Sequence, residues 1–156
     1  MSELVYVKGD ATSPLGDGTR IIAHVCNDIG GWGKGFVVAV SRRWAKPEAE
    51  YRAWHSSGEG FALGAIQVVQ VEPAIWVANM LGQRGIKRDK AGPPIRYDAI
   101  EACLGALATR ATSLRASVHM PRIGCGLAGG EWPKIQPLIE KQLVAQGVRV
   151  TVYDFE

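Results

Sequence analysis

Residues 20–35 have the sequence RIIAHVCNDIGGWGKG, in which a run of apolar residues leads directly into a glycine-rich loop. The run from Arg20 to Val25 predicts a buried β-strand. The apolar and small residues from 36 to 44, which follow the loop, predict a helix. A buried strand, a glycine loop and a helix in this order are typical of an α/β layered protein.

The same alternation of strand and helix continues on both sides of this stretch. Apolar periodicity and turn residues define further elements along the chain. They predict a three-layer α/β/α fold with a mixed central sheet of about six strands. The predicted strands are 4–7, 20–25, 65–71, 75–80, 117–120 and 148–153, and the predicted helices are 36–44, one that opens at Pro47-Glu48, 97–113 and 132–146 with Gly147 as its C-cap.

Length and composition favour one globular domain spanning 1–156. The chain has 156 residues, of which 47% are hydrophobic and 21% charged, and a net charge of +3. This balance excludes a disordered or collagen-like chain. Three cysteines without CxxC spacing predict reduced thiols and neither a disulfide framework nor a zinc site. With no signal peptide and no apolar run near ~20 residues, we expect a cytoplasmic, monomeric protein without a membrane segment.

Two glycine-rich loops, each between a predicted strand and a predicted helix, are the first candidates for chemistry. Residues 27–35 read NDIGGWGKG and residues 122–130 read RIGCGLAGG. Glycines let backbone N–H groups approach a phosphate, and a following helix N-terminus adds a positive dipole. Open α/β sheets bind ligands at the carboxyl ends of their strands, so two such loops favour a diphosphate between them over two plain turns. Cys125 is interpreted as a small packing residue and not as a nucleophile, because no base marks it in the sequence.

Charged residues and histidines supply weaker signals. Asp10 follows the first strand, where it is equally consistent with accepting a hydrogen bond from an exocyclic amine such as that of adenine and with capping a turn. Residues 83–96 carry five cations and one carboxylate, which indicates a solvated loop or a surface for an anion or nucleic acid. His24 and His119 lie in predicted strands and are interpreted as core residues, whereas His55 is expected at the surface.

These motifs, in this order, resemble those of a macrodomain, an ADP-ribose-binding α/β/α module. The resemblance rests on VKGDAT (7–12), IAHVCN (22–27), GGWGKG (30–35), MPRIGCGL (120–127) and VTVY (150–153), which together span nearly the whole chain. The second loop and the closing strand, with a tryptophan before the last helix, resemble the branch that contains the terminal ADP-ribose protein glycohydrolase. The resemblance implies that ADP-ribose binds without metal or cofactor.

The resemblance also implies a role for each loop. Asp10 would accept from the adenine amine, the first glycine loop would hold the proximal phosphate, and the second would hold the distal phosphate and ribose. Tyr153 or Phe155 would flank the adenine. The implied ligand-binding residues are Asp10, Ala11, Gly31, Trp32, Gly33, Lys34, Gly35, Phe36, Ile123, Gly124, Cys125, Gly126, Leu127, Ala128, Tyr153 and Phe155.

The same branch implies hydrolysis of mono-ADP-ribose from acidic side chains of proteins. Asn27 would face the distal ribose, and Asp28 is the candidate base. The glycohydrolase has a lysine near the position of Gln83, where Lys87 or Lys90 offers a substitute, and an aspartate at the position of Ala128. A non-catalytic ADP-ribose reader and an ADP-ribose 1″-phosphate phosphatase are the alternatives. The expected partners are ADP-ribose and mono-ADP-ribosylated proteins, and the small net charge argues against nucleic acid.

Overall fold

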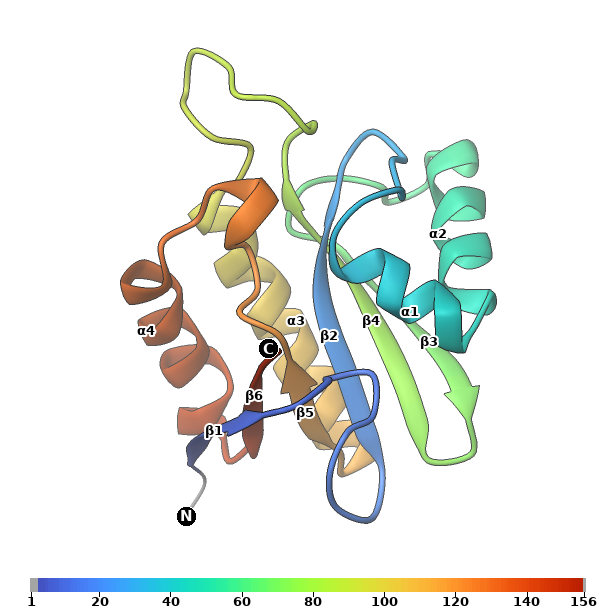
Figure 1. The fold of residues 1–156 in the computed structure, drawn as a ribbon, viewed down its shortest axis with the longest axis vertical. Helices are drawn as coiled ribbons and strands as arrows, with labels where there is room; N and C mark the ends of the chain where they lie inside the picture. Colours follow the sequence, from blue (N-terminus) through green and yellow to red (C-terminus); the bar gives the residue numbers. More distant parts are fainter. Residues whose placement is uncertain (1–2, 156) are drawn as a thin grey trace.

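The architecture is that of a sheet between two pairs of helices, as a computed structural model of the chain shows for residues 3–155 (Figure 1). The six strands are β1 (Leu4–Lys8), β2 (Arg20–Asn27), β3 (Ile66–Glu72), β4 (Ile75–Gln83), β5 (Ser117–Met120) and β6 (Val150–Asp154). The α-helices are α1 (Phe36–Arg43), α2 (Lys46–Ser57), α3 (Tyr97–Leu114) and α4 (Trp132–Gln142). Two 3₁₀ turns are η1 (Gly126–Ala128) and η2 (Val144–Gln146).

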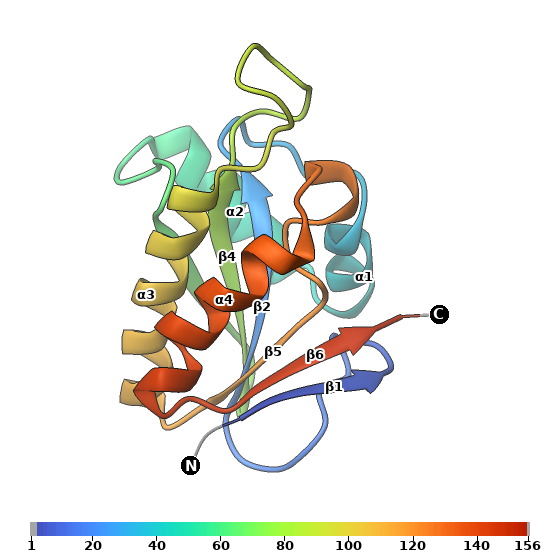
Figure 2. The ribbon, with the colours of Figure 1, turned by 90° about the vertical axis from the view of Figure 1, so that its left-hand side faces the viewer.

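The strands form one mixed sheet in the order β1-β6-β5-β2-β4-β3. All neighbouring strands pair in parallel except β3, which pairs antiparallel with β4. Five parallel strands therefore end at the same edge of the sheet, which is the upper edge for β2 and β4 in Figure 2. The predicted α/β/α fold with a mixed six-stranded sheet is confirmed.

The alternating side chains of β2 explain the two helical layers. Successive side chains of a strand point to opposite faces of the sheet. Ile21 and Ala23 pack in the core shared with α3 and α4. Ile22 and Cys26 pack in the core shared with α1 and α2. Because both faces are covered, β2 is apolar along almost its whole length, as is typical of a central parallel strand.

The sequence prediction was wrong about the length of the last helix. The segment predicted as one helix over 132–146 divides at Leu143, where α4 has ended and η2 follows. Leu143 is fully buried, and its carbonyl accepts the N–H of Val148 at 3.1 Å. Gly147, with φ of +89°, then turns the chain toward β6. Helical periodicity continues through such a tight turn, so the pattern alone gave no sign of the division.

Candidate functional site

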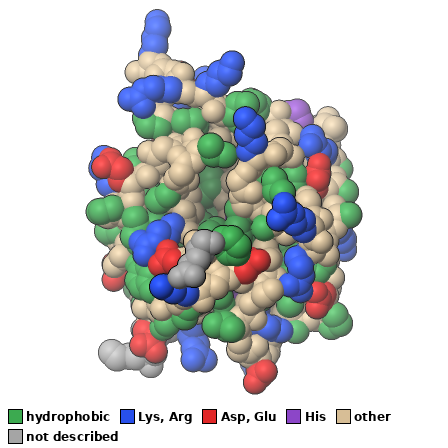
Figure 3. Space-filling model, in the orientation of Figure 1, with side chains coloured by type: hydrophobic (Ala, Val, Ile, Leu, Met, Phe, Trp, Pro, Cys, Tyr) green, Lys and Arg blue, Asp and Glu red, His purple; other side chains and the backbone are tan. Residues whose placement is uncertain are grey.

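A continuous cleft follows the edge of the sheet where the parallel strands end. Three adjoining cavities of about 720, 410 and 500 Å³ make up this cleft. The first is lined by residues after β1 and β6, the second by the loop after β5, and the third by the ends of β2 and β4. Neighbouring cavities share lining residues, among them Phe36 and Pro121 between the first two and Leu127 between the last two. The hollow lies on the face seen in Figure 3.

Asn27 holds the first glycine loop in shape. Its Oδ1 accepts the N–H groups of Ile29 at 3.1 Å and Gly31 at 2.9 Å, and its Nδ2 donates to the Gly31 carbonyl at 2.9 Å. The buried Tyr51 hydroxyl donates to the backbone carbonyl of Asn27 at 2.6 Å and lies 3.0 Å from Oδ1. Asn27 also lines the third cavity, and the second N–H of its amide has no partner among the described residues.

Residues 32–35 of this loop lead directly into the N-terminus of α1. Trp32 is buried, and its indole N–H donates to Ser41 Oγ at 2.8 Å. Gly33 is exposed, and a Cβ built on it would meet no atom within 4 Å. Gly35 is the N-cap residue of α1, and no side chain caps the helix. The N–H of Val38 donates to the Gly35 carbonyl at 3.1 Å, whereas the N–H groups of Phe36 and Val37 have no intrahelical partner, and both residues line the second cavity.

The second glycine loop is packed too tightly for larger side chains. A Cβ on Gly130 would lie 2.3 Å from the Gly124 carbonyl oxygen, and the Gly130 N–H donates to that oxygen at 2.7 Å. Glycine at this position lets the loop fold back on itself and present η1 to the cleft. Leu127, on η1, is 66% exposed and lies across the cleft from Gly35, where a Cβ would come within 3.5 Å of Leu127 Cδ1. The two loops therefore close over the cleft at this point.

Cys125 lies in the wall of the second cavity and is partly buried. Burial raises the pKa of its thiol, and the nearby Arg122 guanidinium only partly opposes that effect. The thiol is therefore protonated at neutral pH, and a protonated thiol is a poor nucleophile. This agrees with the interpretation of Cys125 as a packing residue.

Asp10 and Phe155 stand at the opposite end of the cleft, in the first cavity. Asp10 Oδ1 accepts from the backbone N–H of Thr12 at 2.8 Å and from its hydroxyl at 2.7 Å, so the aspartate does close a turn. Oδ2 has no partner among the described residues. Ala11, beside it, is 2% exposed and lines the same cavity. Phe155 is 78% exposed, so its ring is free to cover a ligand.

Tyr153 differs from Phe155 although both line this cavity. Tyr153 is 3% exposed. Its hydroxyl accepts the N–H of Leu15 at 2.8 Å and lies 2.7 Å from Nδ1 of His119. The hydroxyl is thus already used, and Tyr153 contributes to the cavity wall rather than offering a free ring.

Gln83 and Lys87 line the third cavity, but Asp28 lines none of the three. Asp28 Oδ1 accepts the backbone N–H of Gly85 at 2.8 Å, and the Asp28 N–H donates to the Gln83 carbonyl at 3.0 Å. Gln83 Nε2 donates to the Gly85 carbonyl at 2.9 Å. The carboxylate of Asp28, the candidate base, therefore holds the loop after β4 instead of lining the cleft. Nothing in the sequence indicated where this carboxylate would point. Of the two substitute lysines, Lys87 reaches the cavity and Lys90 does not.

The histidines occupy the positions that the sequence predicted. His24 is buried, its Nε2 lies 2.6 Å from Asn79 Oδ1, and burial lowers its pKa to about 4. His119 is buried beside Ser117 and Tyr153, and burial together with the Arg20 charge lowers its pKa to about 4. His55 is exposed. Both buried histidines are neutral at pH 7, so neither supplies a cation to the cleft.

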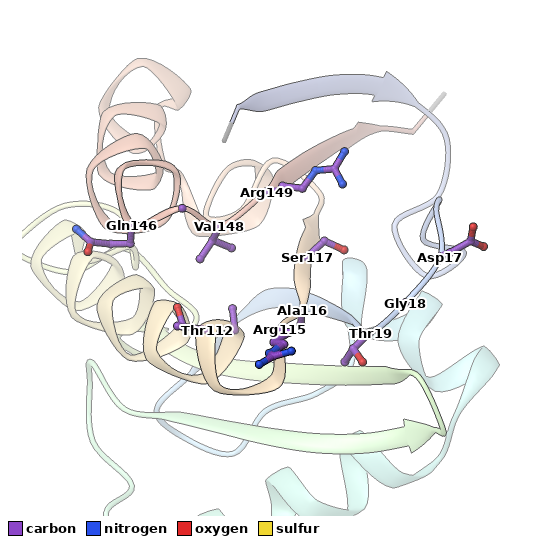
Figure 4. Close-up of a pocket in the computed structure, with 12 residues that line it drawn as sticks. Asp17, Gly18, Thr19, Thr112, Arg115, Ala116, Ser117, Gln146, Val148 and Arg149 are labelled. Atoms are coloured by element: carbon purple, nitrogen blue, oxygen red, sulfur yellow. The ribbon is translucent and has the colours of Figure 1, made fainter. Parts of the chain in front are cut away.

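A fourth cavity, of about 380 Å³, lies at the other end of the parallel strands (Figure 4). It is lined by Thr19 before β2, the end of α3, and Gly147 to Arg149 before β6. No glycine loop or open helix N-terminus faces it. Across residues 3–155, no cluster of three or more His, Cys, Asp or Glu side chains is placed to hold a metal ion. None of the helices in that range is both long and apolar enough to cross a membrane.

Comparison with known proteins agrees with this geometry. No family model matches the chain. It is 58% identical to a macrodomain protein from Streptomyces coelicolor, covering 97% of this chain and 99% of that one with a TM-score of 0.88. It is 55% identical to a protein from Bacteroides thetaiotaomicron, covering 98% of both chains with a TM-score of 0.96. Fold and cleft together define an α/β/α domain whose two glycine loops enclose a ligand-sized groove. The chain belongs to the macrodomain family.

More distant relatives carry functional names. Chromodomain-helicase-DNA-binding protein 1-like of Danio rerio is 30% identical over 95% of this chain, but the chain spans only 15% of that protein's length. An ADP-ribose 1″-phosphate phosphatase of Meyerozyma guilliermondii is 24% identical, covering 96% of this chain and 99% of that protein. The human ADP-ribose glycohydrolase OARD1 is 24% identical, covering 97% and 91%. The structure of Thermosipho africanus DarTG in complex with ADP-ribose shares the fold, with 20% identity, a TM-score of 0.82 and coverage of 100% and 42%.

Proposed function

We propose that this macrodomain binds ADP-ribose along the cleft and hydrolyses mono-ADP-ribose from acidic side chains of proteins. The order of the residues along the cleft supports this proposal. The cleft runs unbroken from an acceptor and an exposed aromatic ring, past two glycine loops, to a polar end formed by Asn27 and Gln83. This succession matches adenine, diphosphate and distal ribose in order. The DarTG structure, which shares the fold and is in complex with ADP-ribose, supports ADP-ribose as the ligand.

The diphosphate would lie between the two glycine loops. The N-terminus of α1 has no side-chain cap, so the N–H groups of Phe36 and Val37 would donate to a phosphate, while that of Val38 is bonded to the Gly35 carbonyl. The start of η1 offers N–H groups from the opposite side. Lys34 lines the cleft at the same level and supplies a positive charge. Backbone donors with one nearby cation are sufficient for a diphosphate without a metal ion.

The adenine would lie in the first cavity. The free Oδ2 of Asp10 accepts a hydrogen bond from its exocyclic amine, and a charged acceptor makes this bond stronger than a neutral one. Phe155 covers the base from the solvent side, and Phe36 lines the cavity wall.

Catalysis would take place at the distal ribose, in the third cavity. ADP-ribose on a glutamate is held by an ester, whose leaving carboxylate departs without protonation. The bond between the anomeric carbon and the ester oxygen breaks as a positioned water supplies the new hydroxyl of the ribose and releases its other proton to solvent, and the site stabilises the negative charge that develops on the leaving carboxylate. Gln83 Oε1 has no partner within residues 3–155, so it is available to accept a hydrogen bond from that water. The N–H groups of η1 and the second N–H of the Asn27 amide stabilise the oxygens. Asp28 acts as a positioning residue, because it fixes Gly85 and with it the loop that carries Lys87.

A phosphatase acting on ADP-ribose 1″-phosphate is the second candidate, favoured by the name of the relative from Meyerozyma guilliermondii. Its leaving ribose oxygen requires an acid. Among residues 3–155, no Asp or Glu lines the second or third cavity, and the one histidine that does, His24, has its Nε2 bound by Asn79. The cleft therefore supports ester hydrolysis better than phosphate-ester hydrolysis.

Two measurements test the proposal. Calorimetry with ADP-ribose, ADP and AMP should give the tightest binding for ADP-ribose, since only ADP-ribose fills all three cavities. Incubation with a target carrying mono-ADP-ribose on glutamate should release ADP-ribose, and incubation with ADP-ribose 1″-phosphate should release no phosphate. Gln83→Ala should slow the release, whereas Gln70→Ala, on the exposed face of β3, should leave it unchanged. Tight binding of ADP-ribose without release of either product would show that the protein is a non-catalytic ADP-ribose reader.

A further inference from the structure

The segment between β4 and α3 carries more positive charge than the net charge of the whole molecule. Residues 83–96 contain five cations and one carboxylate, a net charge of +4, whereas the whole chain has a net charge of +3. The remainder of the protein is therefore slightly acidic. Residues 84–94, here called the basic arm, project beyond the body of the domain (Figures 1 and 2). Lys and Arg side chains gather on this projection in Figure 3.

The basic arm is held in place by its own hydrogen bonds. At its base, the Arg84 N–H donates to the Pro94 carbonyl at 2.9 Å, and Asp28 accepts from Gly85. At its tip, Asp89 and Gly92 exchange two backbone hydrogen bonds. Such a segment presents its side chains in a limited set of positions, which reduces the entropy lost on binding.

The acidic residue of the arm is already neutralised. Arg96 forms an ion pair with Asp89 at 3.0 Å and donates to the carbonyls of Pro93, Pro94 and Ile95. The four other cations, Arg84, Lys87, Arg88 and Lys90, are exposed and have no ion-pair partner among residues 3–155. Charge of one sign with no internal counterpart, concentrated on a projection, is suited to a partner of the opposite sign.

The arm stands at the end of the cleft assigned to the distal ribose. Ile86 and Lys87 line the third cavity together with Asn27 and Gln83. Ile86 is 57% exposed, and Leu127 on the facing rim is 66% exposed. The chain attached to an ADP-ribose in the cleft must leave past this rim. It therefore passes apolar side chains first and the cations of the arm next.

We propose that the basic arm binds an acidic polypeptide segment flanking the modified side chain, and so selects substrates with acidic sequence around the site of attachment. Two observations favour a polypeptide over a nucleic acid. The arm contains no aromatic residue on which a base could stack. Ile86 of the arm is exposed, so it is suited to contact an apolar side chain that lies between acidic residues of the polypeptide. The inference rests on the proposed function only for the position of ADP-ribose.

The test compares two peptides that carry ADP-ribose on the same residue and differ only in their flanks, four glutamates in one and four glutamines in the other. Attachment through an amide nitrogen replaces the ester, so the peptides are not consumed as ester substrates. Exposed ion pairs are individually weak, but several act together here, so the acidic peptide should bind about 10-fold tighter at low salt. This preference should largely vanish at about 0.5 M salt, where the Debye length is a few ångströms.

The variant R84Q/R88Q/K90Q removes the three cations of the arm that line no cavity. It should lose the preference for the acidic peptide and retain the affinity for free ADP-ribose. The control K46Q/R110Q/R149Q removes three exposed cations elsewhere and should keep the preference. Equal binding of both peptides by the wild type, or an unchanged preference in the arm variant, overturns the inference. A failure of free ADP-ribose to bind the wild type instead refutes the proposed function.

The same proteins distinguish the polypeptide from a nucleic acid. An unmodified acidic peptide and a single-stranded oligonucleotide of equal charge would each compete against the labelled acidic peptide. Competition by the acidic peptide at lower concentration supports the inference. Tighter competition by the oligonucleotide, lost in R84Q/R88Q/K90Q, overturns it in favour of nucleic acid.

Discussion

The substitution Gly33→Glu tests directly whether the first glycine loop holds a phosphate. Gly33 does not require a left-handed backbone conformation, and a Cβ at this position meets open space. The residue is exposed, in the loop that precedes α1. The glutamate should therefore leave the fold intact and place its carboxylate beside the ligand. The midpoint of urea unfolding, unchanged within error, would check the first of these expectations.

The expected loss of affinity follows from Coulomb's law. Two like unit charges about 5 Å apart repel by about 0.8 kcal/mol in bulk water and by about 3 kcal/mol near a protein surface. Because the loop is exposed on one side and forms a cleft on the other, a value of about 2 kcal/mol is appropriate. This corresponds to about 30-fold weaker binding of ADP-ribose. The repulsion, and hence the loss, should shrink as salt is raised.

Isothermal titration calorimetry with ADP-ribose at low and high salt measures both effects. Gly33→Gln has nearly the same size and shape without the charge, so it separates repulsion from steric obstruction. We expect Gly33→Gln to bind within a few-fold of the wild type. If Gly33→Glu binds ADP-ribose as tightly as Gly33→Gln at low salt, no phosphate lies beside this loop, and its glycines serve only the turn.

Three further predictions concern the adenine end and the buried histidines. Asp10→Ala should weaken ADP-ribose binding by about 10-fold or more through loss of a charged acceptor, but leave the affinity for ribose 5-phosphate unchanged, as calorimetry would show. Phe155→Ala should weaken ADP-ribose by a few-fold without altering the unfolding midpoint, since the ring is exposed. His24 and His119 have folded pKa values of about 4, below the unfolded value of 6.5, so the unfolded state binds more protons between these values and stability falls as pH drops from about 6.5 toward 4. At pH 4.5, each buried histidine should lower the free energy of unfolding by about 2–3 kcal/mol relative to pH 7, as measured by urea unfolding. The substitution His119→Gln should reduce this loss and His55→Gln should not. A free energy of unfolding that does not change with pH would contradict the assignment.

The fold was predictable because its main signals are local. The apolar run before Asn27 and the glycines after it define a strand and a loop whatever the rest of the chain does. The bounds were less certain where strands depend on partners. β2 and β4 extend to Asn27 and Gln83, beyond their predicted ends, because these two residues pair with each other across the sheet with a shift in register. Pairing of this kind is invisible in either segment alone.

The candidate site likewise contains residues that the sequence could indicate and residues that it could not. The two glycine loops and Asp10 line the cleft, and the sequence could indicate this position because each directly follows a strand. The direction of Asp28 was not predictable. Its carboxylate binds Gly85, which is 57 residues later in the sequence. That contact also holds the base of the basic arm, which carries both Lys87 and Lys90. Side chains whose partners lie on another loop can be assigned only from the structure.

The lining of the distal cavity determines which chemistry this macrodomain is suited to. In the part of the chain that the structure describes, no carboxylate lines the second or third cavity, and the one histidine that does has a pKa of about 4. A reaction whose leaving group must be protonated has no donor of suitable pKa at such a site. The ester between ADP-ribose and a glutamate avoids that requirement, because its leaving carboxylate is stable as an anion at neutral pH. Under the proposed function, a site that only positions water and donates N–H groups would cleave esters in preference to phosphate esters and to N-glycosidic linkages to amides. For the same reason, a peptide linked through an amide nitrogen is expected to bind in the cleft as a stable ligand.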